Sequence, residues 1–153
     1  MSLIVDILES TRAMHDRIAE SCTMRPQHTV HGFVLTHGRE MIAQPRPVWC
    51  ERGTPKECFS NATHLSIRTG LTYVEGFVVR ADIPIPILHG WCVDDDNTVV
   101  DPTIDRPEEC EYYGIPINSD FLQDQMHKSG MYGILDNYKT VDIYQVEPIT
   151  FLE

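Results

Sequence analysis

The sequence lacks the features that would place a protein in or across a membrane. It contains no apolar run long enough to span a lipid bilayer. Its first residues, Met1 to Asp6, contain neither the basic segment nor the apolar segment of a secretory signal. We therefore expect a cytoplasmic protein.

Positive charge is also scarce. The chain has 12 Lys and Arg residues against 23 Asp and Glu residues, and its formal net charge is −11 at pH 7. No basic cluster offsets this charge, so phosphate-rich surfaces should repel the protein. We expect neither a nucleic-acid partner nor a membrane partner.

Closely spaced cysteine pairs are missing as well. The five cysteines stand at positions 22, 50, 58, 92 and 110. An odd set without close pairs argues against a secreted disulfide scaffold and favours reduced thiols. The sequence has no internal repeat, and its 153 residues, 42% of them hydrophobic and 23% charged, fit one globular domain over residues 1–153.

The first third of the chain predicts a helix followed by a hairpin. Apolar residues recur at helical spacing over residues 3–20, which predicts an amphipathic helix on the outside of the domain. Residues 29–43 are strand-like, and His37-Gly38 within them predicts a hairpin turn.

The clearest helix start lies in the middle of the chain. Thr54 as N-cap, Pro55 at the first helical position and Glu57 three residues after the cap form a capping-box pattern. The helix is expected to end near Gly70, because glycine commonly terminates helices. Cys58 would then lie in the first helical turn, with its thiol directed toward the interior.

Three segments have the composition of β-strands: residues 73–80, 87–93 and 98–101. They predict an antiparallel meander, with the acidic residues 94–97 as the turn between the last two strands. The remainder predicts a loop that contains residues 110–114, a short helix over 120–127 and a final strand over 141–146. The expected fold class is therefore α+β, with a central antiparallel sheet and a core helix.

Cys58 is the strongest candidate for a reactive group. A helix N-terminus presents unpaired N–H groups and the positive end of the helix dipole, and both lower the pKa of a thiol. If Val93 pairs with Asn97, His89 and Asp101 lie directly opposite each other on one face of the hairpin. A thiol, an imidazole and an orienting carboxylate are the groups that nucleophilic acyl transfer requires.

Three short segments carry a resemblance to a known family: Pro-Lys-Glu-Cys-Phe-Ser-Asn-Ala (55–62), Leu-His-Gly-Trp-Cys-Val (88–93) and Thr-Val-Val-Asp-Pro-Thr (98–103). They resemble the transglutaminase-like branch of the papain-like superfamily of cysteine enzymes. They are similar to segments of bacterial and phage hypothetical proteins of this type and of lasso-peptide leader peptidases. Arylamine N-acetyltransferases share the same order of Cys, His and Asp.

The resemblance covers residues 54–103 and implies Cys58 as nucleophile, His89 as base and Asp101 as orienter. It implies a papain-like fold, no metal or organic cofactor, and a peptide, protein, small amide or thioester as substrate. If the chain is encoded by a phage, its location is the host cytoplasm. Further candidates for substrate or oxyanion contacts are Gln44, Trp49, Glu75 and Trp91.

All four of those candidates have other interpretations. Glu75 on a central strand would touch the site or pair with a basic residue, unless it faces water at a strand edge. Trp91 shares a strand face with His89 and packs the core beside the imidazole. The backbone N–H of Cys58 is an oxyanion donor that needs neither Gln44 nor Trp49.

Other functions remain open from the residues alone. Cys50, Cys58, His89 and Cys92 could form a zinc site, but the chain has no Cys-x-x-Cys pair, and residues 89 and 92 of a strand point to opposite faces. A noncatalytic interaction protein could retain the fold and bind a basic partner through its acidic surface. Transfer of an acyl group to an amine is the alternative to hydrolysis.

Overall fold

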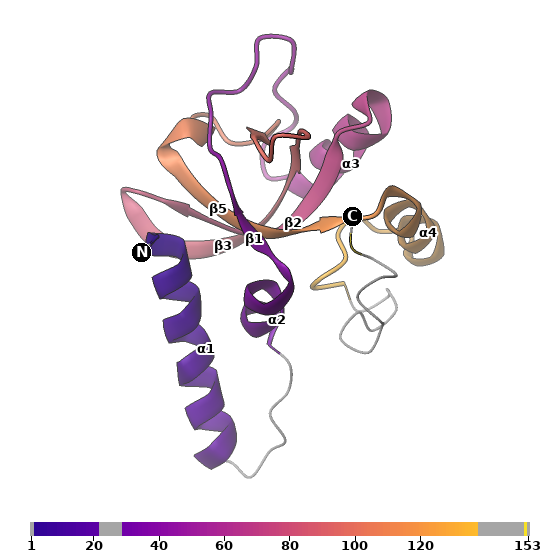
Figure 1. Ribbon diagram of the computed structural model, residues 1–153. Helices are drawn as coiled ribbons and strands as arrows, with labels where there is room; N and C mark the ends of the chain where they lie inside the picture. Colours follow the sequence, from indigo (N-terminus) through magenta and orange to yellow (C-terminus); the bar gives the residue numbers. More distant parts are fainter. Residues whose placement is uncertain (1, 22–28, 138–151, 153) are drawn as a thin grey trace.

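The computed structural model describes residues 2–21, 29–137 and 152, and a curled antiparallel sheet in the order β1-β5-β2-β3-β4 forms its centre (Figure 1). The strands are β1 (Arg39–Met41), β2 (Thr72–Arg80), β3 (Ile83–Val93), β4 (Val99–Val100) and β5 (Cys110–Ile117). The helices are α1 (Leu3–Ser21), α2 (Val30–His37), α3 (Cys58–Thr69) and α4 (Ser119–Ser129), with a short 3-10 helix, η1 (Pro107–Glu109). The α+β class with a central antiparallel sheet is confirmed.

Several predicted elements are confirmed at close to their expected bounds. The amphipathic segment forms α1, and β2, β3 and β4 form the antiparallel meander. Helix α3 ends at Gly70, which adopts a left-handed φ of 76° that favours glycine. The predicted short helix is α4, and the predicted final strand over residues 141–146 lies outside the described residues.

The predicted hairpin over residues 29–43 is wrong. Residues 30–37 form helix α2, and only residues 39–41 form a strand. The Thr29 side chain caps the helix by accepting a hydrogen bond from the N–H of Gly32 at 3.1 Å, and Phe33 and Val34 are buried in the core. A short apolar run fits a helix or a strand, and packing against the sheet and α1 decides in favour of the helix.

The predicted loop around residues 110–114 is also wrong, because this segment forms the first half of strand β5. Gly114 and Pro116 look like turn residues in the sequence, but both lie within the strand, paired with Gly76 and Val74 of β2. Tyr112, Ile115 and Ile117 are buried, and they supply the apolar contacts that a central strand requires.

The two faces of the sheet have separate cores. The outer face packs Tyr73, Phe77 and Val79 of β2 against apolar residues of all four helices. The inner face, which we define by Val74 and Val78 of β2, carries a second core with Trp91 and Tyr112. Helix α3 lies against β3 (Figure 1).

None of the helices in the described part of the chain is both long and apolar enough to cross a membrane.

The close approach of β2 and β5 depends on glycine at two paired positions. Gly76 lies opposite Gly114, and a Cβ atom on Gly76 would collide with the backbone carbonyl oxygen of Tyr113. A Cβ on Gly114 would lie 2.6 Å from the Trp91 ring. The absence of side chains here lets the sheet curl around Trp91.

Gly76→Ala should therefore lower the free energy of unfolding by about 3 kcal/mol, because backbone atoms have to move to accept the methyl group. Chemical denaturation followed by circular dichroism measures this loss. Gly32→Ala is the comparison, since its Cβ would meet only side-chain atoms, Oγ1 of Thr29 and the Arg12 chain. Equal stability of wild type and Gly76→Ala would contradict the close approach.

Candidate active site

Cys58 is the first residue of helix α3, and a turn precedes it. The expected helix start at Thr54 and its capping box are wrong: Lys56 has a φ of 69°, which breaks the helix, and Glu57 at the N-cap makes no side-chain capping bond. The N–H of Glu57 instead donates to the Thr54 carbonyl oxygen at 3.3 Å. Consequently the N–H groups of the first helical turn begin at the nucleophile candidate itself.

The turn before Cys58 is tied to the loop that follows β4. The N–H of Gly53 donates to the carbonyl oxygen of Pro102 at 2.7 Å. The Asn61 side-chain amide donates to the Thr54 carbonyl oxygen at 2.8 Å and to the Thr103 hydroxyl at 3.0 Å. These bonds hold the start of α3 beside the segment that contains Asp101.

His89 lies on the inner face of β3, between Cys58 and Asp101. Its Nε2 is 2.7 Å from Oδ2 of Asp101, and its side chain hydrogen-bonds to Cys58. Because Nε2 is committed to Asp101, we infer that Nδ1 faces the thiol. The imidazole stacks on the Trp91 ring, with centroids 6.0 Å apart and an interplanar angle of 18°.

Asp101 is fully buried and its carboxylate is saturated with donors. Oδ2 accepts from His89 and from the Tyr112 hydroxyl, the latter at 2.9 Å. Oδ1 accepts from the backbone N–H groups of Thr103 at 2.7 Å and Ile104 at 3.1 Å. A buried carboxylate requires such compensation for the loss of water.

The β3–β4 register differs from the expected one but keeps the same faces together. Val93 pairs with Val99 rather than Asn97, a shift of two residues. A shift of one would have moved the two side chains to opposite faces, whereas a shift of two preserves the face. Asp101 therefore approaches His89 diagonally, just beyond the last residue of β4.

The three pKa values shift in the directions that favour an ion pair. Burial alone would lower the pKa of His89, but hydrogen bonds and charges of Asp101 and Cys58 raise it to about 9. Burial alone would raise the pKa of Cys58, yet His89 and the backbone N–H groups of Gly90 and Phe59 lower it. A similar balance holds for Asp101, whose pKa is lowered despite burial by His89, Thr103 and Ile104.

The lowered pKa of Cys58 and the raised pKa of His89 favour a thiolate beside an imidazolium. Cys50, Cys92 and Cys110 lie in the opposite situation, because burial raises their thiol pKa values. Among the described cysteines, which are all free, Cys58 alone has a lowered pKa.

Tyr112 is a site residue that the sequence interpretation missed. It lies in β5, which the sequence predicted as loop, so nothing placed its hydroxyl near the hairpin. Its ring also packs edge-on against Trp91, with centroids 5.1 Å apart. A strand prediction for residues 110–117 would have placed Tyr112 on the inner face.

The other candidates from the sequence occupy different places. Trp91 is fully buried next to His89, as expected, and its Nε1 lies 3.2 Å from the Met41 sulfur. Gln44 donates its side-chain amide to the Val99 carbonyl oxygen at 2.9 Å, and Trp49 is 59% exposed. Neither Gln44 nor Trp49 lines the cavity beside His89.

Glu75 is buried, and the expected basic partner or contact with water is wrong. Its Oε1 accepts from the Tyr73 hydroxyl at 2.7 Å and from the N–H of Ile134 at 2.6 Å, and Oε2 accepts from the N–H of Leu135 at 2.9 Å. Burial raises the pKa of Glu75. The carboxylate thus fastens the segment after α4 to the outer face of the sheet, against the Phe59 ring that Gly133 approaches.

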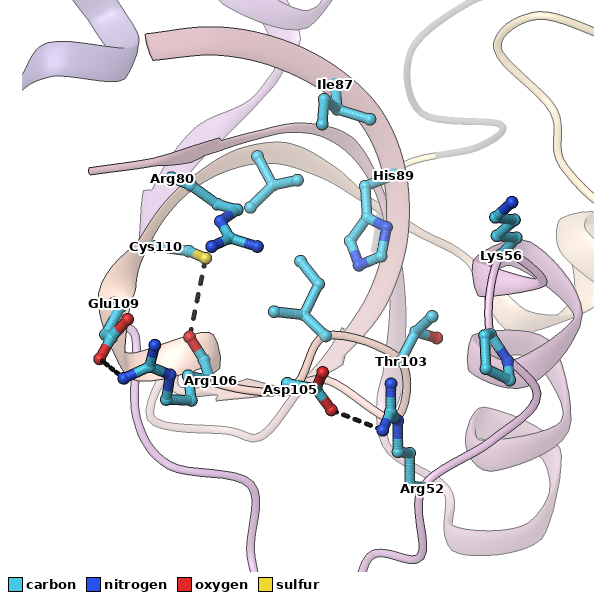
Figure 2. A pocket seen from close by; sticks show the side chains of 13 residues that line it. Arg52, Lys56, Arg80, Ile87, His89, Thr103, Asp105, Arg106, Glu109 and Cys110 are labelled. Atoms are coloured by element: carbon cyan, nitrogen blue, oxygen red, sulfur yellow. Dashed lines mark hydrogen bonds and ion pairs between the residues drawn. The ribbon is translucent and has the colours of Figure 1, made fainter. Parts of the chain in front are cut away.

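A cavity of about 390 Å³ opens beside His89 on the inner face of the sheet (Figure 2). Its apolar wall includes Val78, Ile87 and Ile104, and the turn before Cys58 forms one rim. Figure 2 shows the strands arching around this space, with the His89 ring directed into it. A substrate in the cavity would therefore lie next to the candidate base.

The zinc alternative gains no support from the positions of its candidate ligands. Among the described residues, no group of three or more His, Cys, Asp and Glu side chains could hold a metal ion. The Cys92 sulfur instead contacts the Ala62 carbonyl oxygen at 3.3 Å.

Comparisons with known proteins do not assign a family: no family model matches the chain, and neither the curated proteins nor the solved structures contain a significant match.

Asp101→Asn should lower the pKa of His89 from about 9 by roughly two units, because the charge that opposes the effect of burial is removed. The NMR titration of the His89 ring measures this shift. Tyr112→Phe is the matched control: it removes one hydrogen bond to Asp101 but leaves the charge, so the pKa should stay within roughly half a unit. An unchanged His89 pKa in Asp101→Asn would contradict the pairing.

Glu75→Gln should lower the free energy of unfolding by about 2 kcal/mol, because an amide NH₂ group would face backbone N–H donors at Ile134 and Leu135. Tyr73→Phe removes one hydroxyl donor from the same carboxylate and should cost about 1 kcal/mol. Urea unfolding followed by fluorescence gives both values. If Glu75→Gln is as stable as Tyr73→Phe, Glu75 does not hold the loop through its bonds to Ile134 and Leu135.

Proposed function

We propose that this protein is a cysteine-dependent acyl-transfer enzyme that hydrolyses or transfers at an amide or thioester carbonyl through an acyl group on Cys58. The observation that carries the proposal is the chain of contacts from Cys58 through His89 to the saturated carboxylate of Asp101. A merely structural cysteine at a helix start would need neither an imidazole partner nor a lowered pKa.

The first half of the reaction forms the acyl-enzyme. The Cys58 thiolate adds to the carbonyl carbon, a carbon–sulfur bond forms, and the carbonyl π electrons move to oxygen. The bond to the leaving amine or thiol then breaks as His89 transfers its proton to that group. The backbone N–H of Cys58, at the start of α3, is suited to hold the oxyanion.

The second half returns the enzyme to its starting state. A water molecule or an amine attacks the thioester carbonyl, and neutral His89 takes its proton. The carbon–sulfur bond breaks, the product leaves, and the thiolate and imidazolium are restored. Asp101 stays ionised throughout, and it orients the ring and stabilises the imidazolium.

The proposal includes membership of the papain-like and transglutaminase-like superfamily. Support comes from a helix with Cys at its first position, packed against an antiparallel sheet that supplies His, with Asp directly after the last strand of the meander. The free thiols of the described cysteines are in keeping with the proposed cytoplasmic location. The proposed substrate is a peptide, a protein or a small amide or thioester.

Iodoacetamide should alkylate Cys58 at pH 7 at least about tenfold faster than Cys50, Cys92 or Cys110, because only Cys58 has a lowered pKa among them. Peptide mass spectrometry over time measures each rate in a Cys22→Ser background. His89→Ala should slow the alkylation of Cys58 about tenfold or more. Equal, slow labelling of all four thiols would favour the noncatalytic binding protein instead.

The pH dependence follows from the two pKa shifts. The thiolate of Cys58 forms below the ordinary thiol pKa of 9.0, so the alkylation rate should rise at a lower pH than for a free cysteine. Acyl transfer also needs protonated His89 for the leaving group, so turnover should fall as the pH rises through about 9. Alkylation that begins only above pH 9 would contradict the ion pair.

A further inference from the structure

The cavity beside His89 carries more positive charge than the acidic chain around it. Four of the 12 Lys and Arg residues line it: Arg52, Lys56, Arg80 and Arg106. Asp105 and Glu109 are the two carboxylates among its lining residues. In a protein of formal charge −11, this local reversal of sign requires an explanation.

Two of the four cations are neutralised within the lining. Arg52 pairs with Asp105 at 2.6 Å, and Arg106 pairs with Glu109 at 2.7 Å (Figure 2). Lys56 has no ion pair with any described residue, and the partner of Arg80 is Asp82, which does not line the cavity. Lys56 is thus the lining cation without an ion pair, whereas Arg80 brings a guanidinium into the cavity lining while its counter-charge lies outside that lining.

Arg80 is oriented by an ion pair with Asp82. Its Nε and one terminal nitrogen donate to the two carboxylate oxygens of Asp82, at 3.0 and 2.9 Å. This bidentate ion pair leaves the other terminal nitrogen, Nη1, without a partner among the described residues. Figure 2 shows the guanidinium extending from β2 over the cavity. The arrangement presents Nη1 as a donor to an incoming anion.

The position of Arg80 on β2 sets a spacing from His89, the candidate base. Gly76 pairs with His89, and Arg80 lies four residues farther along β2. The span is at most about 13 Å at the strand rise of 3.3 Å per residue, because the pairing is irregular between Val78 and Arg80. Its side chain extends over the cavity (Figure 2). An anion at Nη1 would therefore lie two or three residues from the reacting carbonyl of an extended peptide.

We propose that the cavity is the binding site for the acyl part of the substrate, and that Arg80, supported by the charge of Lys56, selects a carboxylate there. Resting on the proposed function, this inference names the substrate class: an acidic peptide with Glu or Asp two residues before the residue that carries the reacting carbonyl. The apolar wall of Val78, Ile87 and Ile104 accommodates the aliphatic part of the Glu or Asp side chain.

Two peptide chloromethyl ketones test this specificity: acetyl-Glu-Ala-Gly chloromethyl ketone and the probe with Gln in place of Glu. The Cys58 thiolate displaces chloride, and a carbon–sulfur bond forms. We expect the Glu probe to alkylate Cys58 about tenfold faster, the effect of one charge-assisted hydrogen bond. The preference should fall with added salt, because the site is open to solvent.

Variants of the cavity assign the preference to a residue. Arg80→Gln should reduce the Glu-to-Gln rate ratio to near one, whereas Arg80→Lys should keep a several-fold preference, because the charge remains. Arg106→Gln is the matched control: it removes a lining cation whose ion-pair partner, Glu109, also lines the cavity, so the ratio should persist. A ratio of one in the wild type, or a preference that survives Arg80→Gln, would overturn the proposal.

The iodoacetamide rate separates this proposal from the proposed function. Fast iodoacetamide alkylation of Cys58 without a Glu preference overturns only the anion site. If Cys58 is unreactive, the nonreactive acetyl-Glu-Ala-Gly amide still tests the site through the NMR signal of the Arg80 Nε–H group. A shift with the Glu peptide but not with the Gln peptide supports the anion site, and no shift with either peptide refutes it.

Discussion

The candidate site depends on the buried carboxylate of Asp101. An isolated carboxylate without water would be very unfavourable, and four donors from three different segments replace the lost water. His89 comes from β3, Tyr112 from β5, and the N–H groups of Thr103 and Ile104 from the following loop. One charge therefore joins two strands and a loop, and it also raises the pKa of the imidazole that faces Cys58.

Hydrogen bonds to this same loop also position the nucleophile candidate, Cys58. Pro102 and Thr103, directly after Asp101, accept hydrogen bonds from Gly53 and Asn61 on the Cys58 side. The helix start and the carboxylate are thus parts of one hydrogen-bonded unit, although more than forty positions separate them in the chain. We expect small displacements of the loop to affect the thiol and the imidazole together.

The curled sheet separates two kinds of buried acid. On the inner face, Asp101 has an imidazole and a hydroxyl as partners, and its pKa is lowered. On the outer face, Glu75 has a hydroxyl and two N–H groups but no cationic partner among the described residues, and its pKa is raised. The first arrangement raises the pKa of the neighbouring base, His89, whereas the second attaches the loop after α4 to the sheet. Glycine at positions 76 and 114 allows the curvature that keeps these two environments apart.

Much of the architecture could be predicted from local patterns. Helical periodicity located α1, alternating and β-branched segments located the meander, and Gly70 marked the end of α3. The pairing of His89 with Asp101 was predictable because successive side chains of a strand alternate between its two faces. A register error of two residues therefore leaves both side chains on the same face. Local sequence patterns were therefore sufficient to identify Cys58, His89 and Asp101 as the triad candidates.

The remaining features depend on contacts between distant segments. Residues 30–37 are apolar enough for a strand or a helix, and packing against α1 and β5 decides between them. Tyr112 reaches Asp101 only because β5 lies beside β2, and the two backbone N–H partners of Glu75 come from a loop about sixty residues later. The sequence by itself determined the reactive residue types and the local elements. Tertiary structure alone decided which donors saturate each buried charge, because that depends on which strands become neighbours.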